Sequence, residues 1–285
     1  MSAKPRRRWR RWTALLALLG VAGLARGYWN STRAPVVRTA AVAVADWPAE
    51  QAPLRVLLLS DTHVAGPDMP PERLARIVDR LNRLKPDLVL VAGDLVSEKR
   101  TATHIYTPAE IVAPLGRLKA PLGVIVAPGN HDHWFRPDAL RGALERQGLG
   151  VLQNEAVKRG PLIVGGVDDD YTGHDDIPKT FAAMDALGPG VPVIVSHSPD
   201  IVPDLRRPVA AVFAGHTHCG QIRLPVIGAL TYVSRYGSRF ACGDITDEGQ
   251  RLFVGAGLGT SILPLRFNTP PDVWLVTIGP QGAAR

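Results

Sequence analysis

The sequence has few cysteines and no internal repeats, two features that would have assigned it to a particular class of protein. It has two cysteines in 285 residues, Cys219 and Cys242, too few for the disulfide framework of a small secreted domain. Because Cys219 directly follows a histidine-rich motif, we expect it to line a site as a small residue rather than to form half of a disulfide. There is no repeat at a solenoid period and no low-complexity tract. These absences, with 46% apolar residues, leave an ordinary globular protein with a full core.

Acidic residues are absent from the first 33 positions, which hold eight of the 33 basic residues of the chain. The remaining 25 basic residues face 26 acidic ones, so the body is close to neutral although the whole chain carries a charge of +7. A neutral body argues against a face that binds nucleic acid. We therefore expect no nucleic-acid partner.

The N-terminus also lacks a long apolar run. The uncharged segment from Thr13 to Ala25 has 13 residues, which rise about 20 Å as a helix, short of a hydrocarbon core of about 30 Å. Extension to Trp29 makes a marginal anchor, and a cleavable signal peptide fits equally well. An amphipathic foot on a cytosolic chain fits less well, because Leu and Ala cover every face. We expect membrane attachment through the N-terminus with the folded part on the outer face, or export and release.

Five short polar motifs each follow a short apolar run. Such runs, bounded by Gly and Pro, are typical of buried strands. Sites in layered α/β sheets form beyond the carboxyl ends of strands, so the motifs predict one shared site. They are Ser60-Asp61-Thr62-His63, Gly93-Asp94, Gly129-Asn130-His131-Asp132, Ser196-His197 and Gly215-His216-Thr217-His218.

The order of elements predicts an α/β protein with two packed sheets flanked by helices. The predicted strands cover 54–60, 88–92, 122–127, 150–153, 161–167, 192–196, 210–214, 250–255 and 272–278. The predicted helices cover 71–83, 137–147 and 178–187. We assign 1–33 to a basic leader with a signal or transmembrane segment, 34–53 to a linker or edge strand, and 54–285 to the main domain.

The motifs supply the ligands of a two-metal site. Asp61 and His63 are two residues apart after an extended segment, so both can reach one cation. One carboxylate, that of Asp94, can bridge two cations. Nitrogen and oxygen ligands without thiolate fit two divalent ions among Mn, Fe, Zn and Ni. The seven candidate ligands are Asp61, His63, Asp94, Asn130, His197, His216 and His218.

Two such cations would act on a phosphoryl group. At about 3.5–4 Å apart they clamp its oxygens and hold a bridging hydroxide for in-line attack. His131 is then left as the general acid that protonates the leaving alkoxide. Asp132 either fixes the tautomer of His131 or holds the loop. Each motif alone is typical of a simple turn, and it is the ordered set of five that favours the metal site.

The order of the five motifs resembles that of the calcineurin-like metallophosphoesterase superfamily, over residues 54 to about 279. The resemblance implies a four-layer α/β/β/α sandwich of two mixed sheets. It also implies a role for each residue. Asp61, His63 and His218 would hold the first metal, Asn130, His197 and His216 the second, with Asp94 bridging and His131 as general acid.

Two further stretches, Cys219-Gly220-Gln221 and 255–267, resemble a bacterial branch of small membrane-associated or exported phosphoesterases. We expect Asp168, Asp169 and Asp170 to form a solvated turn. Arg266 is expected either to meet a phosphate or to form a surface ion pair.

The sequence therefore predicts a dimetal phosphoester hydrolase, a phosphodiesterase by preference, acting on a membrane-linked or small phosphate. A lipid-linked phosphate follows from a site close to a membrane, by fold-level analogy only. A protein phosphatase or nucleotidase is the enzymatic alternative. A non-catalytic scaffold is the other, although such a protein should have lost Asn130, His131 or a bridging acid. A nuclease is disfavoured by the neutral body.

Overall fold

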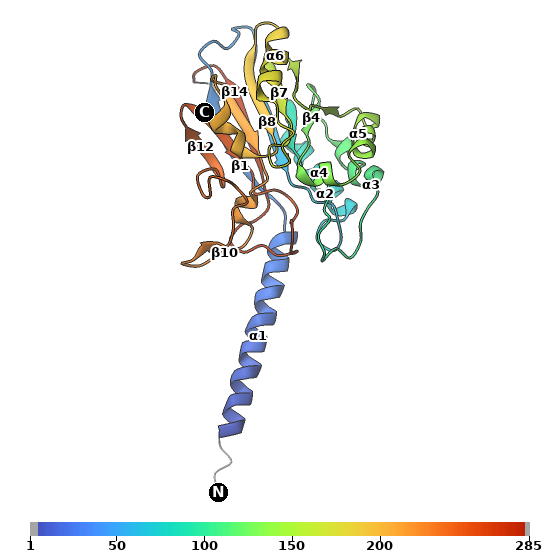
Figure 1. Cartoon of the computed structure of the whole chain (residues 1–285), viewed down its shortest axis with the longest axis vertical. Coiled ribbons are helices and arrows are strands. Elements are labelled where there is room, and N and C mark those ends of the chain that lie inside the picture. The colour runs from blue at the N-terminus through green and yellow to red at the C-terminus, as the bar shows by residue number, and fades with distance from the viewer. Residues whose placement is uncertain (1–4, 283–285) are drawn as a thin grey trace.

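The computed structural model describes residues 5–282, so positions 1–4 of the predicted leader and 283–285 of the predicted domain lie outside the described residues. A layered domain carries one long helix, α1 (Pro5–Thr32), which leaves it as a single rod (Figure 1). The N-terminal end of α1 is the end farther from the domain (Figure 1). Within residues 5–282, no helix combines the length and the apolar content that crossing a membrane requires.

The first sheet has six strands in the order β1, β14, β2, β3, β4, β5. Its neighbours pair in parallel, except β14 and β2, which are antiparallel. Part of the segment 34–53, which we expected to be a linker or an edge strand, forms β1 at one edge of this sheet. The strands are β1 (Val36–Ala43), β2 (Leu54–Ser60), β3 (Leu88–Ala92), β4 (Val124–Ala127), β5 (Gly150–Val151) and β14 (Asp272–Gly279).

The second sheet has the order β12, β13, β9, β8, β7, β6, with antiparallel pairs at both edges and parallel pairs between them. Its two edge strands, β6 and β12, were not expected from the sequence. The strands are β6 (Glu155–Arg159), β7 (Leu162–Val167), β8 (Val191–Ser196), β9 (Ala211–Ala214), β12 (Gly243–Asp247) and β13 (Gln250–Val254). A separate hairpin joins β10 (Arg223–Leu224) to β11 (Gly228–Ala229).

Three buried clusters separate four layers, which confirms the predicted α/β/β/α sandwich. Alternate residues of β2 divide between two of them, since Val56 packs between the sheets and Leu57 packs under the helices. Both faces of the sheet are therefore buried, which explains the unbroken apolar runs. The third cluster lies between the second sheet and α6. The helices are α2 (Pro71–Leu81), α3 (Pro108–Val112), α4 (Asn130–Trp134), α5 (Pro137–Arg146) and α6 (Ile177–Ala186). Short 3₁₀ turns cover Asn82–Leu84, Leu115–Arg117, Pro199–Asp204 and His218–Gly220.

The two cysteines form a disulfide between Cys219 and Cys242, whose Cα atoms are 4.7 Å apart. The expectation that Cys219 only lines the site is therefore wrong. The residues are 23 positions apart in sequence, and it is the fold after β9 that brings them together. The disulfide ties the turn after the last histidine motif to the start of β12.

Candidate metal centre

All five polar motifs follow strands, and their side chains meet at one edge of the sandwich. Asp61 and His63 follow β2, Asp94 follows β3, His197 follows β8, and Asn130 opens α4 after β4. Five of the candidate ligands have left-handed backbones, which non-glycine residues seldom adopt. Such strain gathers at functional sites where the surrounding structure holds it in place. The five φ angles are 49° for Asp61, 42° for His63, 53° for Asp94, 67° for His216 and 50° for His218.

Backbone hydrogen bonds between the loops fix these conformations. The amide of Asp61 donates to the carbonyl of Gly93 (2.9 Å), and the amide of His63 donates to that of Asp94 (3.0 Å). Gly93 itself has a φ of +66°, and a Cβ there would lie 2.6 Å from the amide nitrogen of Gly129. The third motif therefore approaches the second closely because position 93 has no side chain.

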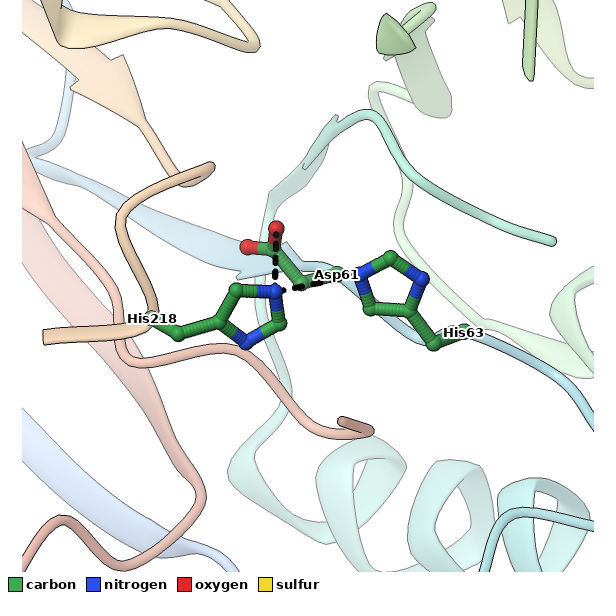
Figure 2. A group of neighbouring side chains, drawn as sticks. All are labelled: Asp61, His63 and His218. Carbon is green, nitrogen blue, oxygen red and sulfur yellow. Dashed lines mark hydrogen bonds and ion pairs between the residues drawn. The ribbon is translucent and has the colours of Figure 1, made fainter. Parts of the chain in front are cut away.

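The first group of ligands joins the two sheets. Nε2 of His63 lies 3.0 Å from Nε2 of His218, and the latter lies 3.5 Å from Oδ1 of Asp61 (Figure 2). All three side chains are buried. One carboxylate oxygen and two ring nitrogens thus converge on one point.

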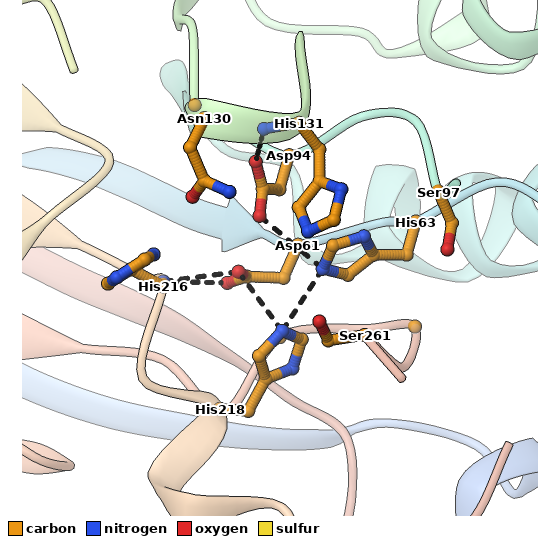
Figure 3. Close-up of polar contacts among 12 residues, drawn as sticks. Asp61, His63, Asp94, Ser97, Asn130, His131, His216, His218 and Ser261 are labelled. Atoms are coloured by element: carbon orange, nitrogen blue, oxygen red, sulfur yellow. Dashed lines mark hydrogen bonds and ion pairs between the residues drawn. The ribbon is translucent and has the colours of Figure 1, made fainter. Parts of the chain in front are cut away.

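The second group lies on the other side of Asp94. Nε2 of His197 is 3.0 Å from Nδ1 of His216 and 3.2 Å from Oδ1 of Asn130. It is also 3.2 Å from Oδ2 of Asp94. That same Oδ2 is 3.5 Å from Nε2 of His63 in the first group. Asp94 therefore stands between the two groups, and Figure 3 shows it among their side chains.

Two histidines are oriented by backbone carbonyls, which act as acceptors. Nδ1 of His63 lies 3.0 Å from the carbonyl of Val96, and Nδ1 of His197 lies 2.9 Å from that of Ala92. A protonated Nδ1 that donates to a carbonyl leaves Nε2 with a lone pair, as metal-ligating histidines require. The Nε2 atom of His63 faces His218 and Asp94 at 3.0 and 3.5 Å. The Nε2 atom of His197 faces His216 at 3.0 Å, and Asn130 and Asp94 at 3.2 Å. Acceptor atoms that converge without donors repel one another, and a divalent cation bound between them would remove that repulsion. The residues therefore fit the predicted metals.

The electrostatics of the site favour ligand-competent states for most of these groups. Burial lowers the pKa of His63 and His218 well below its ordinary value and that of His216 to about 3. Burial alone would raise the pKa of Asp94, but the neighbouring His197 lowers it well below its ordinary value. Burial opposes a charge on His197, yet Asp94 raises its pKa well above 6.5. His197 therefore binds a cation in competition with a proton.

His131 lies beside both groups, and a nitrogen of its ring falls within 4.8 Å of ligand atoms of His63 and Asp94. Its backbone amide donates to Oδ1 of Asp94 (2.9 Å), and its ring packs edge-on against His63, with centroids 4.9 Å apart. Its Nδ1 finds no hydrogen-bond partner among residues 5–282. Figure 3 shows the ring pointing toward His63. The ring is thus positioned beside both groups.

Asp132 holds the loop, which is the second of the two roles considered for it. Its Oδ1 accepts from the amide of Leu95 (2.8 Å) and its Oδ2 from that of Gly129 (3.0 Å). Burial raises the pKa of Asp132 to about 7. The carboxyl group thereby fastens the loop that carries His131 to the loop that carries Asp94.

Two weaker expectations from the sequence are wrong. Asp168 and Asp169 are buried rather than solvated. Asp168 accepts a 2.7 Å hydrogen bond from His133 in place of water. Arg266 is fully buried and makes no surface ion pair. Its guanidinium donates to the carbonyls of Ala256 and Gly259 and lies 3.3 Å from Nδ1 of His218. No local signal reveals this, because its partners are backbone atoms of the preceding loop.

A layered sandwich with these groups at its edge defines a metallophosphoesterase. The sequence profile of the calcineurin-like phosphoesterase family matches residues 54–220. The chain belongs to this family of metal-dependent phosphoester hydrolases.

Several proteins resemble the chain over most of its length. An uncharacterized metallophosphoesterase of Helicobacter pylori J99 is 29% identical, covering 81% of this chain and 61% of its own length. A zebrafish (Danio rerio) transmembrane protein with metallophosphoesterase domain is 30% identical, covering 87% and 58%. The uncharacterized metallophosphoesterase YkuE of Bacillus subtilis is 28% identical, covering 79% and 78%. The chain thus spans about three-fifths of the length of the first two relatives.

Among solved structures, a 5′-nucleotidase precursor from Thermus thermophilus aligns with 79% of this chain and 55% of its own. The TM-score is 0.43 and the identity 15%. A likeness of this size carries no information about substrate.

Proposed function

We propose that the chain hydrolyses phosphoesters at a centre of two divalent cations. The position of Asp94 carries the proposal. One of its oxygens lies 3.5 Å from Nε2 of His63 and 3.2 Å from Nε2 of His197, so a single carboxylate reaches both ligand groups. Membership of the metallophosphoesterase family supports the same interpretation.

The assignment of ligands follows the two groups, with Asp94 shared between them. When bound, the cations would neutralise charge on the phosphoryl oxygens and activate a water for in-line attack. The first cation would be held by Asp61, His63 and His218, and the second by Asn130, His197 and His216.

His131 supplies the proton in this proposal. Its ring lies beside His63 and Asp94, where it could protonate a leaving alkoxide oxygen, a step that contributes about 10²–10⁴-fold. Asp132 keeps the loop in place by accepting backbone hydrogen bonds. Asn130 opens the same short helix, so one loop positions a ligand and the acid together.

The substrate we propose is a phosphodiester linked to a membrane, or a small phosphate, outside the cytoplasm. In this proposal the uncharged segment of α1, from Thr13 to Ala25, attaches the chain to the membrane. The name of the zebrafish relative is consistent with membrane attachment. The disulfide between Cys219 and Cys242 supports an oxidising compartment.

A non-catalytic scaffold is the alternative from another class. It is disfavoured because all seven candidate ligands and His131 are present and converge. A protein phosphatase or nucleotidase uses the same centre and differs only in substrate, so assays of cleavage separate these alternatives.

The test uses the full chain in detergent, stripped of metal and reloaded with Mn, Zn, Fe or Ni. We expect metal-dependent cleavage of bis-p-nitrophenyl phosphate in preference to p-nitrophenyl phosphate. Asn130→Ala should abolish it through loss of a ligand, and His131→Ala should lower kcat about 10²–10⁴-fold with metal content retained. His104→Ala, at an exposed loop histidine, serves as the matched control. A folded protein without turnover under any metal would contradict the proposal.

A further inference from the structure

Large apolar side chains are exposed in two short segments beside the metal centre. Ile227 is 72% exposed, Leu230 60% and Ile262 71%, while Val226 at the tip of the β10–β11 hairpin is fully exposed. Among residues 33–282, six of the ten exposed large hydrophobics fall in 226–233 and 262–263. Exposed apolar residues gathered in this way mark an interaction site.

The two segments form one hydrogen-bonded unit, held together by Gln221. Its side-chain nitrogen donates to the carbonyls of Leu263 (3.0 Å) and Leu265 (3.1 Å). Its side-chain oxygen accepts from the amide of Ser261 (3.0 Å). The hairpin is joined to the same loop, since the amide of Arg223 donates to the carbonyl of Phe267 (3.0 Å). The apolar tips are therefore fixed relative to each other.

The C-terminal end of α1 is docked on the same unit. The carbonyl of Gly27 accepts from the amide of Arg266 (3.0 Å), and Ser31 donates through Oγ to the carbonyl of Pro264 (3.0 Å). A Cβ at Gly27 would lie 2.7 Å from the ring of Phe267, so glycine allows this close contact. Figure 1 shows the β10 hairpin at the base of the domain, next to the point where α1 leaves it.

A basic groove borders α1 as well. It is lined by Tyr28 and Arg33 from the end of α1 and by Arg76 and Arg80 from α2. The three arginines are exposed, and the two on α2 are four residues apart, on one face of that helix. Arginines at this level suit the phosphates of anionic lipids, each contributing about 1 kcal/mol near such a surface.

From this arrangement we propose that the hairpin tip and residues 262–263 enter the interface of a lipid bilayer beside α1, while Arg33, Arg76 and Arg80 contact anionic headgroups. The inference rests on the membrane attachment proposed above and extends it from the helix to the domain. Apolar side chains beside the end of α1, with basic ones in the groove that borders the same helix end, match the two layers of a membrane surface. A rigid link to α1 sets their depth.

The consequence for the reaction is an active site held at the membrane surface. The loop that carries Ile262 also contains Ser261, which lies beside His218 in Figure 3. The same loop covers the ligands, since the amide of Gly259 donates to the carbonyl of Asp61 (2.8 Å). The segment proposed to enter the bilayer is therefore continuous with the loop that contacts the metal ligands.

The test places a fluorescent label at single introduced cysteines. Both native cysteines are paired, so a nitrobenzoxadiazole label reacts only with the new one. We would label Ile227→Cys, Ile262→Cys, Leu18→Cys in α1 and Ala182→Cys on the exposed face of α6, which lies at the far end of the domain. Each full-length variant is reconstituted in vesicles of three parts phosphatidylcholine to one part phosphatidylglycerol, with and without doxyl-labelled lipid. Cleavage of bis-p-nitrophenyl phosphate confirms that each variant is folded.

We expect doxyl lipid to quench labels at 227, 262 and 18 at least twofold and to leave the label at 182 unchanged. Vesicles without phosphatidylglycerol should quench positions 227 and 262 less. Quenching at 18 but not at 227 or 262 would overturn the inference and leave membrane attachment intact. No quenching at 18 would instead refute the attachment itself. A label at 227 that becomes buried without lipid, in proportion to protein concentration, would identify a second copy of the chain as the partner and overturn the inference.

Discussion

The metal centre and the face around the end of α1 break the ordinary rule of burial in opposite directions. At the metal centre, charged and polar side chains such as Asp61 and His197 are fully buried. At the α1 face, Ile227 and Ile262 are mostly exposed. Each departure costs free energy in an isolated domain, so each implies a partner that offsets it. We propose divalent cations for the first region and a bilayer for the second.

Arg266 connects the two regions. Its backbone amide bonds to the end of α1, while its buried guanidinium fastens the loop over the metal ligands. The regions are thus mechanically joined but chemically different, and variants can separate them.

The largest expected effect comes from Asp94→Asn, which breaks only the metal centre. Loss of the shared carboxylate weakens both cation sites, so activity on bis-p-nitrophenyl phosphate should fall about 10³-fold or more. Metal content, measured by mass spectrometry, should fall with it, whereas vesicle binding should stay unchanged. Retained metal and activity would show that Asp94 is no bridge.

Arg266→Lys should disturb the joint between the regions. The planar guanidinium donates hydrogen bonds to several backbone carbonyls, and a lysine ammonium cannot reach all of them. Some buried carbonyls would therefore lose their donor. We expect the free energy of unfolding, measured in urea, to drop by about 2–4 kcal/mol. Arg207→Lys, at an exposed pair with Asp185, should change it by less than about 1 kcal/mol. Equal effects of the two variants would contradict the role given to Arg266.

Removal of the disulfide should lower the free energy of unfolding by a similar amount. A loop of 23 residues closed by Cys219 and Cys242 restricts the unfolded chain by about 3 kcal/mol. Unfolding of the wild type with reductant should then match that of the Cys219→Ala/Cys242→Ala variant, on which reductant has no further effect. A wild type insensitive to reductant would mean that the bond does not form in the protein as made.

The smallest expected effect concerns the pair of His133 and Asp168, which is next to the metal centre because His133 lies on α4 with Asn130 and His131. The hydrogen bond that His133 donates to Asp168 raises the pKa of His133 above 6.5. The pair's stabilisation is therefore complete below about pH 6.5 and is lost as the pH rises through the folded-state pKa. Stability should decline by about 1 kcal/mol over that rise. His133→Gln should remove this slope and His104→Gln should not, as measured by urea unfolding at several pH values.

The sequence predicted the first region well because its information is local. Unbroken apolar runs such as 56–59 mark strands with both faces buried, and β2 and β3 lie where they were predicted. Parallel strand ends share one edge, so the residues that follow them were expected to meet. All seven candidate ligands do lie together.

The second region could not be predicted, because it depends on contacts between distant segments. Val226 and Ile227 look like core residues in a sequence, and only the fold leaves them exposed. The burial of Arg266 and the pairing of Cys219 depend on partners brought near by the last strands. The edge strands β6 and β12 were not predicted because their alternating polar residues give only a weak local signal for a strand.

The most direct test of the account is anomalous diffraction from crystals soaked in Mn²⁺. We predict two peaks, about 3.5–4 Å apart as in other two-metal sites. One should be bounded by Asp61, His63 and His218, and the other by Asn130, His197 and His216, with the carboxylate of Asp94 between them. A single peak, or none within this group of side chains, would contradict the two-cation centre.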